Sequence, residues 1–166
     1  MKHLLLARHA KSSWDLSGLS DHDRPLNERG ERDVPRMGQA LAQRGVKPDL
    51  IVSSTANRAL TTAEGLAGEF GMEGERLRSF SDLYLAAPSL ILRVIQGLDE
   101  SEDCVLLVGH NPGMHEAASL LDTASSVSSF PTLAVARFEI DVEFWGEVEW
   151  GAGFLVELLT PKTLEE

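Results

Sequence analysis

Cysteine is nearly absent from this sequence, and Cys104 has no partner within the chain. An internal disulfide is therefore excluded, and a reducing compartment, the cytoplasm, is expected. Long apolar runs are also missing. The longest, Leu4–Ala7 and Val105–Val108, are far shorter than the roughly 20 residues of a membrane span. No apolar stretch with a cleavage site follows Met1, so we expect neither a secretory signal nor a membrane-inserted protein.

Basic residues are scarce. The chain carries 15 Lys and Arg against 26 Asp and Glu, a formal net charge of −11. This balance argues against nucleic-acid binding, which depends on neutralising backbone phosphates, and against docking on anionic lipid. Only four of the basic residues are lysines and eleven are arginines. Arginine holds planar or tetrahedral oxyanions with a rigid fork of N–H donors, so the arginines near histidine are of interest.

Length and composition indicate one folded unit. The 166 residues, 43% of them hydrophobic and 25% charged, match a single globular domain over residues 1–166. A chain of this size buries roughly 70% of its unfolded surface, so it needs no disulfide or metal to fold. No internal repeat, low-complexity tract or linker interrupts it.

Strand-like and helix-like segments alternate, which predicts an α/β protein: a three-layer α/β/α sandwich with a mostly parallel central sheet. Expected strands are His3–Arg8, Leu50–Ser53, Arg76–Phe80 and Val105–Val108, followed by an antiparallel pair, Leu133–Ile140 and Glu147–Leu158. Expected helices are one capped by Asn27 and ending near Gly45, one over Ala59–Phe70, one over Pro88–Leu98, and one over 113–121. In the last helix, Asn111 is the expected cap and Pro112 the first helical residue. Residues 10–26 are polar and rich in turn residues, which predicts a long loop.

Three segments place arginine or histidine where a predicted strand ends. They are Leu6-Ala7-Arg8-His9-Ala10, Ser53-Ser54-Thr55-Ala56-Asn57-Arg58-Ala59 and Val108-Gly109-His110-Asn111. Because the carboxyl ends of parallel strands gather at one edge of a sheet, we expect Arg8, His9, Arg58 and His110 to meet there. Two guanidiniums, two imidazoles and a helix N-terminus suit a tetrahedral dianion.

These residues have two other interpretations. A single Arg-His pair or a Gly-His turn is most often surface or core, but three strand ends in one chain that all carry such residues are much rarer. A metal site is the second alternative. His9 and His110 lie far apart without a nearby Cys or an HExxH pattern, and Arg8 adjoins His9, which disfavours a cation. We therefore expect neither metal nor cofactor.

The same motifs resemble the histidine phosphatase superfamily, also called phosphoglycerate mutase-like. The likeness rests on Arg8-His9-Ala10, on Ser54-x-x-x-Arg58-Ala59-x-x-Thr62-Ala63 and on Gly109-His110. Within the superfamily, Arg8-His9-Ala10-Lys11-Ser12, Asp21-x-x-Arg24-Pro25-Leu26 and Phe130-Pro131-Thr132 are similar to SixA-type phosphohistidine phosphatases. Ala10, where much of the superfamily has Gly, fits the SixA-like group, whereas Thr55 departs from the usual Pro after the Ser.

The resemblance implies a role for each matching residue. His9 is the expected nucleophile and takes the phosphoryl group as a phosphohistidine. His110 lies opposite and contacts the phosphoryl oxygens, which Arg8 and Arg58 clamp. Arg24 is a further candidate contact. Most members also carry an acidic proton donor after the third strand.

Asp82 is the only carboxylate in the matching region of this chain, and capping or a surface turn explains it equally well. Phosphohistidine has little need of a strong enzymic acid, because imidazole is a good leaving group once its nitrogen is protonated.

The resemblance thus implies a phosphatase that hydrolyses phosphohistidine on a partner protein, such as a phosphotransfer protein, and releases inorganic phosphate. The first alternative is a phosphomonoesterase or mutase acting on small phosphate esters. The second is a non-catalytic phosphate-binding module, which would keep Arg8 and Arg58 but need no nucleophile.

Overall fold

The computed structural model describes residues 1–124 and 126–165. Six strands form one sheet in the order β3-β2-β4-β1-β5-β6. The strands are β1 (Lys2–Arg8), β2 (Leu50–Ser54), β3 (Leu77–Phe80), β4 (Cys104–Gly109), β5 (Val135–Ile140) and β6 (Gly153–Leu159). The helices are α1 (Glu28–Gln43), α2 (Asn57–Phe70), α3 (Pro88–Gln96) and α4 (Gly113–Leu121), with short 3₁₀ turns between several elements.

The sheet is mostly parallel. β1 pairs in parallel with β4, β4 with β2, and β2 with β3, whereas β5 runs antiparallel to both β1 and β6. The carboxyl ends of β1, β2 and β4 therefore lie at the same edge. The predicted fold class is confirmed.

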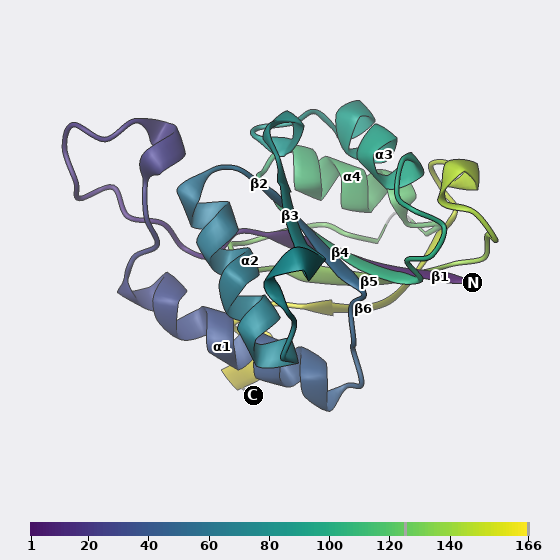
Figure 1. The fold of residues 1–166 in the computed structure, drawn as a ribbon, viewed down its shortest axis with the longest axis horizontal. Helices are drawn as coiled ribbons and strands as arrows, with labels where there is room; N and C mark the ends of the chain where they lie inside the picture. Colours follow the sequence, from purple (N-terminus) through teal and green to yellow (C-terminus); the bar gives the residue numbers. More distant parts are fainter. Residues whose placement is uncertain (125, 166) are drawn as a thin grey trace.

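Helices cover both faces of the sheet, α1 and α2 on one side and α3 and α4 on the other (Figure 1). Side chains of β1 alternate between the two layers: Leu4 and Leu6 join the core beneath α3 and α4, whereas Leu5 and Ala7 join the core beneath α1 and α2. Burial on both faces explains why this strand is an unbroken apolar run rather than an alternating one. No helix in the described part of the chain has the length and apolar character needed to cross a bilayer.

The segment between β1 and α1 projects from the body of the molecule (Figure 1). Its base is closed by an antiparallel bridge between Ser12 and Leu26. The Ser13 N–H donates to the Pro25 carbonyl at 2.8 Å, and the Asn27 N–H donates to the Lys11 carbonyl at 3.0 Å. The expected long loop is confirmed, with one short turn at Asp21–Asp23.

Most boundaries differ from the sequence-based expectation by one or two residues, as at β5, which begins at Val135 rather than Leu133, and two of the differences are informative. The last strand begins at Gly153 rather than Glu147, because the preceding segment leaves the sheet to bury Trp145, whose indole N–H donates to the Glu102 carbonyl at 2.6 Å. Pro112 holds the N-cap position of α4 and Gly113 is the first helical residue. Asn111 therefore lies one position before the cap, where its side-chain oxygen accepts from the His115 N–H at 3.2 Å.

Candidate active site

The two histidines meet because they follow neighbouring parallel strands. Arg8, the last residue of β1, is in register with Gly109, the last residue of β4, so His9 and His110 leave the sheet side by side. Their ring centroids lie 5.2 Å apart at an interplanar angle of 54°. Both residues are buried.

A pocket of about 210 Å³ opens at this edge of the sheet. It is lined by Arg8, His9, Lys11, Ser12, Trp14, Asp21, Arg24, Arg58, Leu85, His110, Asn111 and Thr132. Five of the six predicted site residues are among these. The sixth, Asp82, is exposed and lines a separate cavity with Arg78 and Arg93.

The tautomer of His9 follows from its hydrogen bond. Nδ1 lies 2.7 Å from the carbonyl oxygen of Ala10, which can only accept, so Nδ1 carries the proton. In the neutral ring the lone pair is then on Nε2. Burial, with Arg58, Arg8 and Arg24 nearby, lowers the pKa of His9 to about 4, so the ring is neutral near pH 7.

His110 is held by Ser54, the last residue of β2. Nε2 of His110 lies 2.8 Å from the Ser54 hydroxyl oxygen, which also accepts the Ala56 N–H at 3.2 Å. The Ser54 hydroxyl keeps a proton that it can donate to Nε2, an arrangement that places the imidazole proton on Nδ1. Nδ1 is buried and has no hydrogen-bond partner in the described part of the protein. Burial is the main cause, and the nearby His9 the second, that lowers the pKa of His110 to about 3.

Arg58 comes from the first turn of α2 and is oriented by Asp21, from the projecting loop. Nη1 donates to the Asp21 carbonyl oxygen at 2.7 Å and Nη2 to the carboxylate at 3.0 Å. The same carboxylate accepts the Tyr84 hydroxyl at 2.5 Å and Arg24 Nη1 at 2.9 Å. The hydrogen bond from Tyr84 and those from the two arginines hold the pKa of Asp21 well below its usual range.

Arg24 is buried, and each of its nitrogens is engaged within the loop. Nε donates to the Ser13 carbonyl at 3.0 Å, Nη1 to Asp21, and Nη2 to the Ser12 hydroxyl. Its guanidinium carbon also lies 3.2 Å from the ring centroid of Trp14. Arg24 thus lines the pocket and fixes the loop around it.

Arg8 is freer. Its Nη1 donates to the Phe130 carbonyl at 3.4 Å, and its buried Nε has no hydrogen-bond partner among the described residues. Burial, with Arg58 nearby, lowers the pKa of Arg8 from its ordinary value. Nε of Arg8 and Nδ1 of His110 are therefore two buried nitrogens without a partner among the described residues, and both belong to residues that line the pocket.

Sequence reasoning gave no role to four residues that build this site. Asp21 orients Arg58 and is itself bonded by Tyr84, and Ser54 forms a hydrogen bond with Nε2 of the His110 ring. Thr62 ties the segment after β1 to α2: its hydroxyl accepts the Ala10 N–H at 3.0 Å and donates to the Arg58 carbonyl at 2.7 Å. The available signal for Asp21, Ser54 and Thr62 was their place in the motifs that carry the family resemblance, and Tyr84 stood in none of them.

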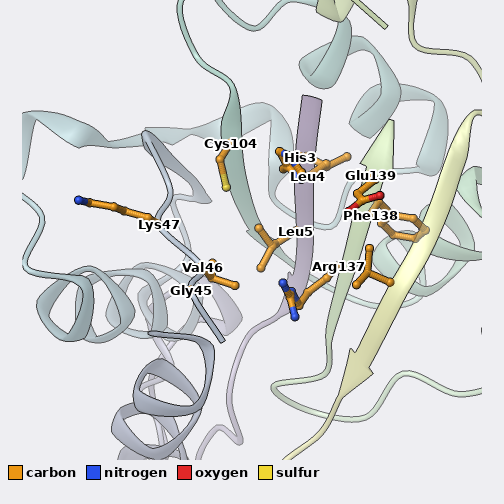
Figure 2. Close-up of a pocket in the computed structure, with 11 residues that line it drawn as sticks. His3, Leu4, Leu5, Gly45, Val46, Lys47, Cys104, Arg137, Phe138 and Glu139 are labelled. Carbon is orange, nitrogen blue, oxygen red and sulfur yellow. The ribbon is translucent and has the colours of Figure 1, made fainter. Parts of the chain in front are cut away.

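Cys104 lies at the other end of its strand, in a second cavity of about 290 Å³ (Figure 2). This cavity adjoins the amino ends of β1 and β4, whereas the two histidines follow their carboxyl ends. Burial raises the pKa of the Cys104 thiol to about 11, so it stays protonated and is a poor nucleophile. Across residues 1–124 and 126–165, no group of three or more His, Cys, Asp or Glu side chains is arranged to hold a metal ion.

An α/β sandwich with a neutral, oriented histidine beside arginines at the strand ends has the features expected of a site for a tetrahedral anion. The model of the histidine phosphatase superfamily (branch 1) matches residues 4–86. This chain belongs to that superfamily.

Several known proteins are similar to most of this chain. An uncharacterised protein of Mycobacterium tuberculosis is 31% identical over 164 residues, 93% of this chain and 99% of that protein. A chloroplastic protein of Arabidopsis thaliana is 33% identical over 132 residues, 75% of this chain but 61% of that longer protein. A crystal structure from Agrobacterium tumefaciens, assigned as a phosphohistidine phosphatase SixA, has a TM-score of 0.81 at 30% identity and covers 96% of this chain and 98% of its own. The chain is therefore of the SixA type within the superfamily.

Proposed function

We propose that the protein is a metal-independent phosphohistidine phosphatase with His9 as its nucleophile. The observation that carries this proposal is the bond from His9 Nδ1 to the Ala10 carbonyl, because it leaves the Nε2 lone pair of a neutral imidazole free for attack. A phosphate-binding module needs arginines but has no use for a histidine prepared in this way.

In the first step, Nε2 of His9 attacks the phosphorus and the N–P bond of the substrate breaks. The leaving imidazole keeps the bonding electron pair and takes a proton from solvent, since Asp82 lies outside the pocket. In the second step, water attacks the phosphoryl group on His9. The new N–P bond breaks, a proton goes to solvent, and inorganic phosphate leaves while neutral His9 is restored.

The pocket's donors stabilise the charge that spreads over the phosphoryl oxygens during both transfers. Arg8 and Arg58 supply guanidinium N–H groups. His110 supplies Nδ1–H, provided that Ser54 holds the proton off Nε2. Arg24 contributes by fixing the loop, with three of its five N–H groups engaged by Ser12, Ser13 and Asp21.

A protein substrate is favoured over a small phosphate ester by the size of the pocket. At about 210 Å³ it is smaller than the roughly 300–1,000 Å³ typical of sites that enclose a small molecule. It can admit a phosphoryl group and an imidazole that project from a larger surface. The SixA assignment of the Agrobacterium relative supports the same substrate class, and the single cysteine supports a cytoplasmic location.

The test is a substrate comparison at matched ionic strength, because the net charge of −11 repels anions at long range. We expect a much higher kcat/KM for phosphohistidine-containing histone than for 3-phosphoglycerate or a sugar bisphosphate. Efficient, saturable hydrolysis of the small esters with phosphohistidine untouched would assign the protein to the small-molecule branch. Phosphate binding without single-turnover transfer to His9 would make it a binding module.

A further inference from the structure

The projecting loop carries an exposed apolar surface next to the catalytic pocket. All residues from 14 to 20 are exposed, and three of them are large and apolar. Trp14 is 74% exposed, Leu16 56% and Leu19 42%. We call these three side chains the apolar loop surface. Leaving so much apolar area in water within one short segment is unfavourable unless a partner covers it.

Trp14 joins this surface to the active site. It lines the pocket, and the Arg24 guanidinium stacked on its ring fixes the indole at the mouth. One polypeptide can therefore cover the apolar loop surface and place its phosphoryl group in the pocket, because Trp14 belongs to both.

Leu85, which lines the same pocket, is a second exposed apolar side chain at the mouth. It is 57% exposed, and its backbone has a φ of +51°, a conformation that residues with a Cβ seldom adopt. Strain of this kind is found where function requires a side chain in a particular place.

The charges restrict the occupant further. Asp15 is the only charged residue between 14 and 20, so this part of the loop has no cation with which to attract a phosphate. A phosphoglycerate or a sugar phosphate has no apolar surface to offer either. A polypeptide can do both: its phosphohistidine enters the pocket between the arginines, and the aliphatic side chains beside it cover the apolar loop surface.

We propose that the apolar loop surface and Leu85 bind aliphatic residues that flank the phosphohistidine of a polypeptide substrate, and so determine specificity. This inference rests on the proposed phosphohistidine phosphatase activity. It assigns recognition to residues that take no part in phosphoryl transfer.

Two synthetic peptides test the proposal. Each contains one histidine, phosphorylated chemically with phosphoramidate, and they differ only in having leucines or serines beside it. Phosphoramidate itself serves as a substrate without a polypeptide. We expect the wild-type protein to hydrolyse the leucine peptide with a kcat/KM about tenfold higher than the serine peptide, the size of effect usual for a well-placed apolar contact.

The variant is the double substitution Leu16→Gln and Leu19→Gln, neither residue lining the pocket. It should abolish the preference for leucine and leave phosphoramidate hydrolysis unchanged. Leu85→Asn, which suits the positive φ, should reduce the preference in the same way. The matched control is Leu120→Gln on α4, which changes a leucine that is 46% exposed and should keep the wild-type preference.

Equal hydrolysis of the two peptides by the wild-type protein would overturn the inference while upholding the phosphatase activity. Failure to hydrolyse any phosphohistidine substrate would overturn the activity, and the inference with it. Sedimentation of the wild-type protein at assay concentration should show a monomer. A dimer that the double variant dissociates would show that a second copy covers the loop, and would also overturn the inference.

Discussion

Arg58 is tied to Asp21 by two hydrogen bonds, one to the backbone carbonyl at 2.7 Å and one to the side-chain carboxylate at 3.0 Å. A residue of the loop thereby orients an arginine of α2 at the pocket. The carboxylate also offsets part of the positive charge that Arg8, Arg24 and Arg58 bring to the site. The arginine cluster can therefore persist without a bound anion.

The Arg58→Lys substitution tests this geometry. Lysine keeps the charge but loses the fork that bonds both Asp21 oxygens, so we expect kcat/KM for a phosphohistidine substrate to fall on the order of 100-fold. Arg93→Lys, on the exposed surface of α3, is the matched control and should retain normal kinetics. Wild-type rates in the Arg58 variant would show that the fork is dispensable.

His9→Ala should remove essentially all turnover, because no other side chain at the pocket presents a free imidazole nitrogen in the same place. Rapid acid-free quenching with radiolabelled substrate should detect a phosphohistidine enzyme in the wild-type protein and none in the variant. His3→Ala changes an exposed histidine at the opposite end of the same strand and should label normally. Near-normal turnover by His9→Ala would contradict the covalent route.

Ser54→Ala should lower kcat about tenfold, the cost of one neutral hydrogen bond. Without the hydroxyl, Nε2 of His110 can keep the imidazole proton and turn a lone pair on Nδ1 toward the phosphoryl oxygens. Ser53→Ala provides the control, since that buried hydroxyl donates to the Ser54 carbonyl and not to His110. Equal kcat values for the two variants would remove Ser54 from the mechanism.

Both site histidines make the stability depend on pH. Their folded-state pKa values, about 4 for His9 and about 3 for His110, lie below the ordinary 6.5. As the pH falls from 6.5 toward 4, the unfolded chain binds protons that the folded protein does not, so the free energy of unfolding decreases. Asp21, with a lowered pKa, adds a loss in the same direction only below about pH 4.

Urea unfolding followed by tryptophan fluorescence at pH 7 and pH 5 measures this effect. Each histidine should account for about 2 kcal/mol of the decrease between the two values. His9→Gln should therefore lose less stability on acidification than the wild-type protein. The same decrease in both would show that His9 titrates normally in the folded state.

Chelators should leave the activity unchanged, because the arginines and the neutral histidines provide the donors that the reaction needs. Prolonged dialysis against EDTA, followed by assay with and without added zinc or magnesium, is the direct measurement. Inactivation that either metal reverses would contradict a metal-independent mechanism.

The sequence could predict the parts of the site that strands carry. Arg8, His9 and His110 follow buried strands whose apolar runs are unmistakable, and parallel pairing then brings their ends to one edge. The sandwich followed from the same alternation of strands and helices. The end of the chain was harder, because burying the large Trp145 outweighed continued strand pairing over residues that alternate like a strand.

Strand patterns could not predict that Asp21 and Tyr84 meet at the site. Nor could they predict that Asp82 lies outside the pocket. Asp21 and Tyr84 are 63 positions apart in the sequence and meet only because a loop folds back over the sheet edge. No periodicity encodes such a path. Asp82 and Tyr84 are close neighbours after β3, and only the local turn decides which of them is directed to the site.

The closed base of the projecting loop allows the tip of the loop to change without moving the active site. The Ser12–Leu26 bridge and its flanking hydrogen bonds hold the ends of the loop together, so a change in its length costs little and does not propagate to His9. Substitutions and insertions are therefore tolerated best at the exposed tip, residues 14 to 20. Asp21 and Arg24 follow this stretch and bond to each other, and Asp21 bonds to Arg58, so a change at the tip leaves the groups that orient the arginine in place.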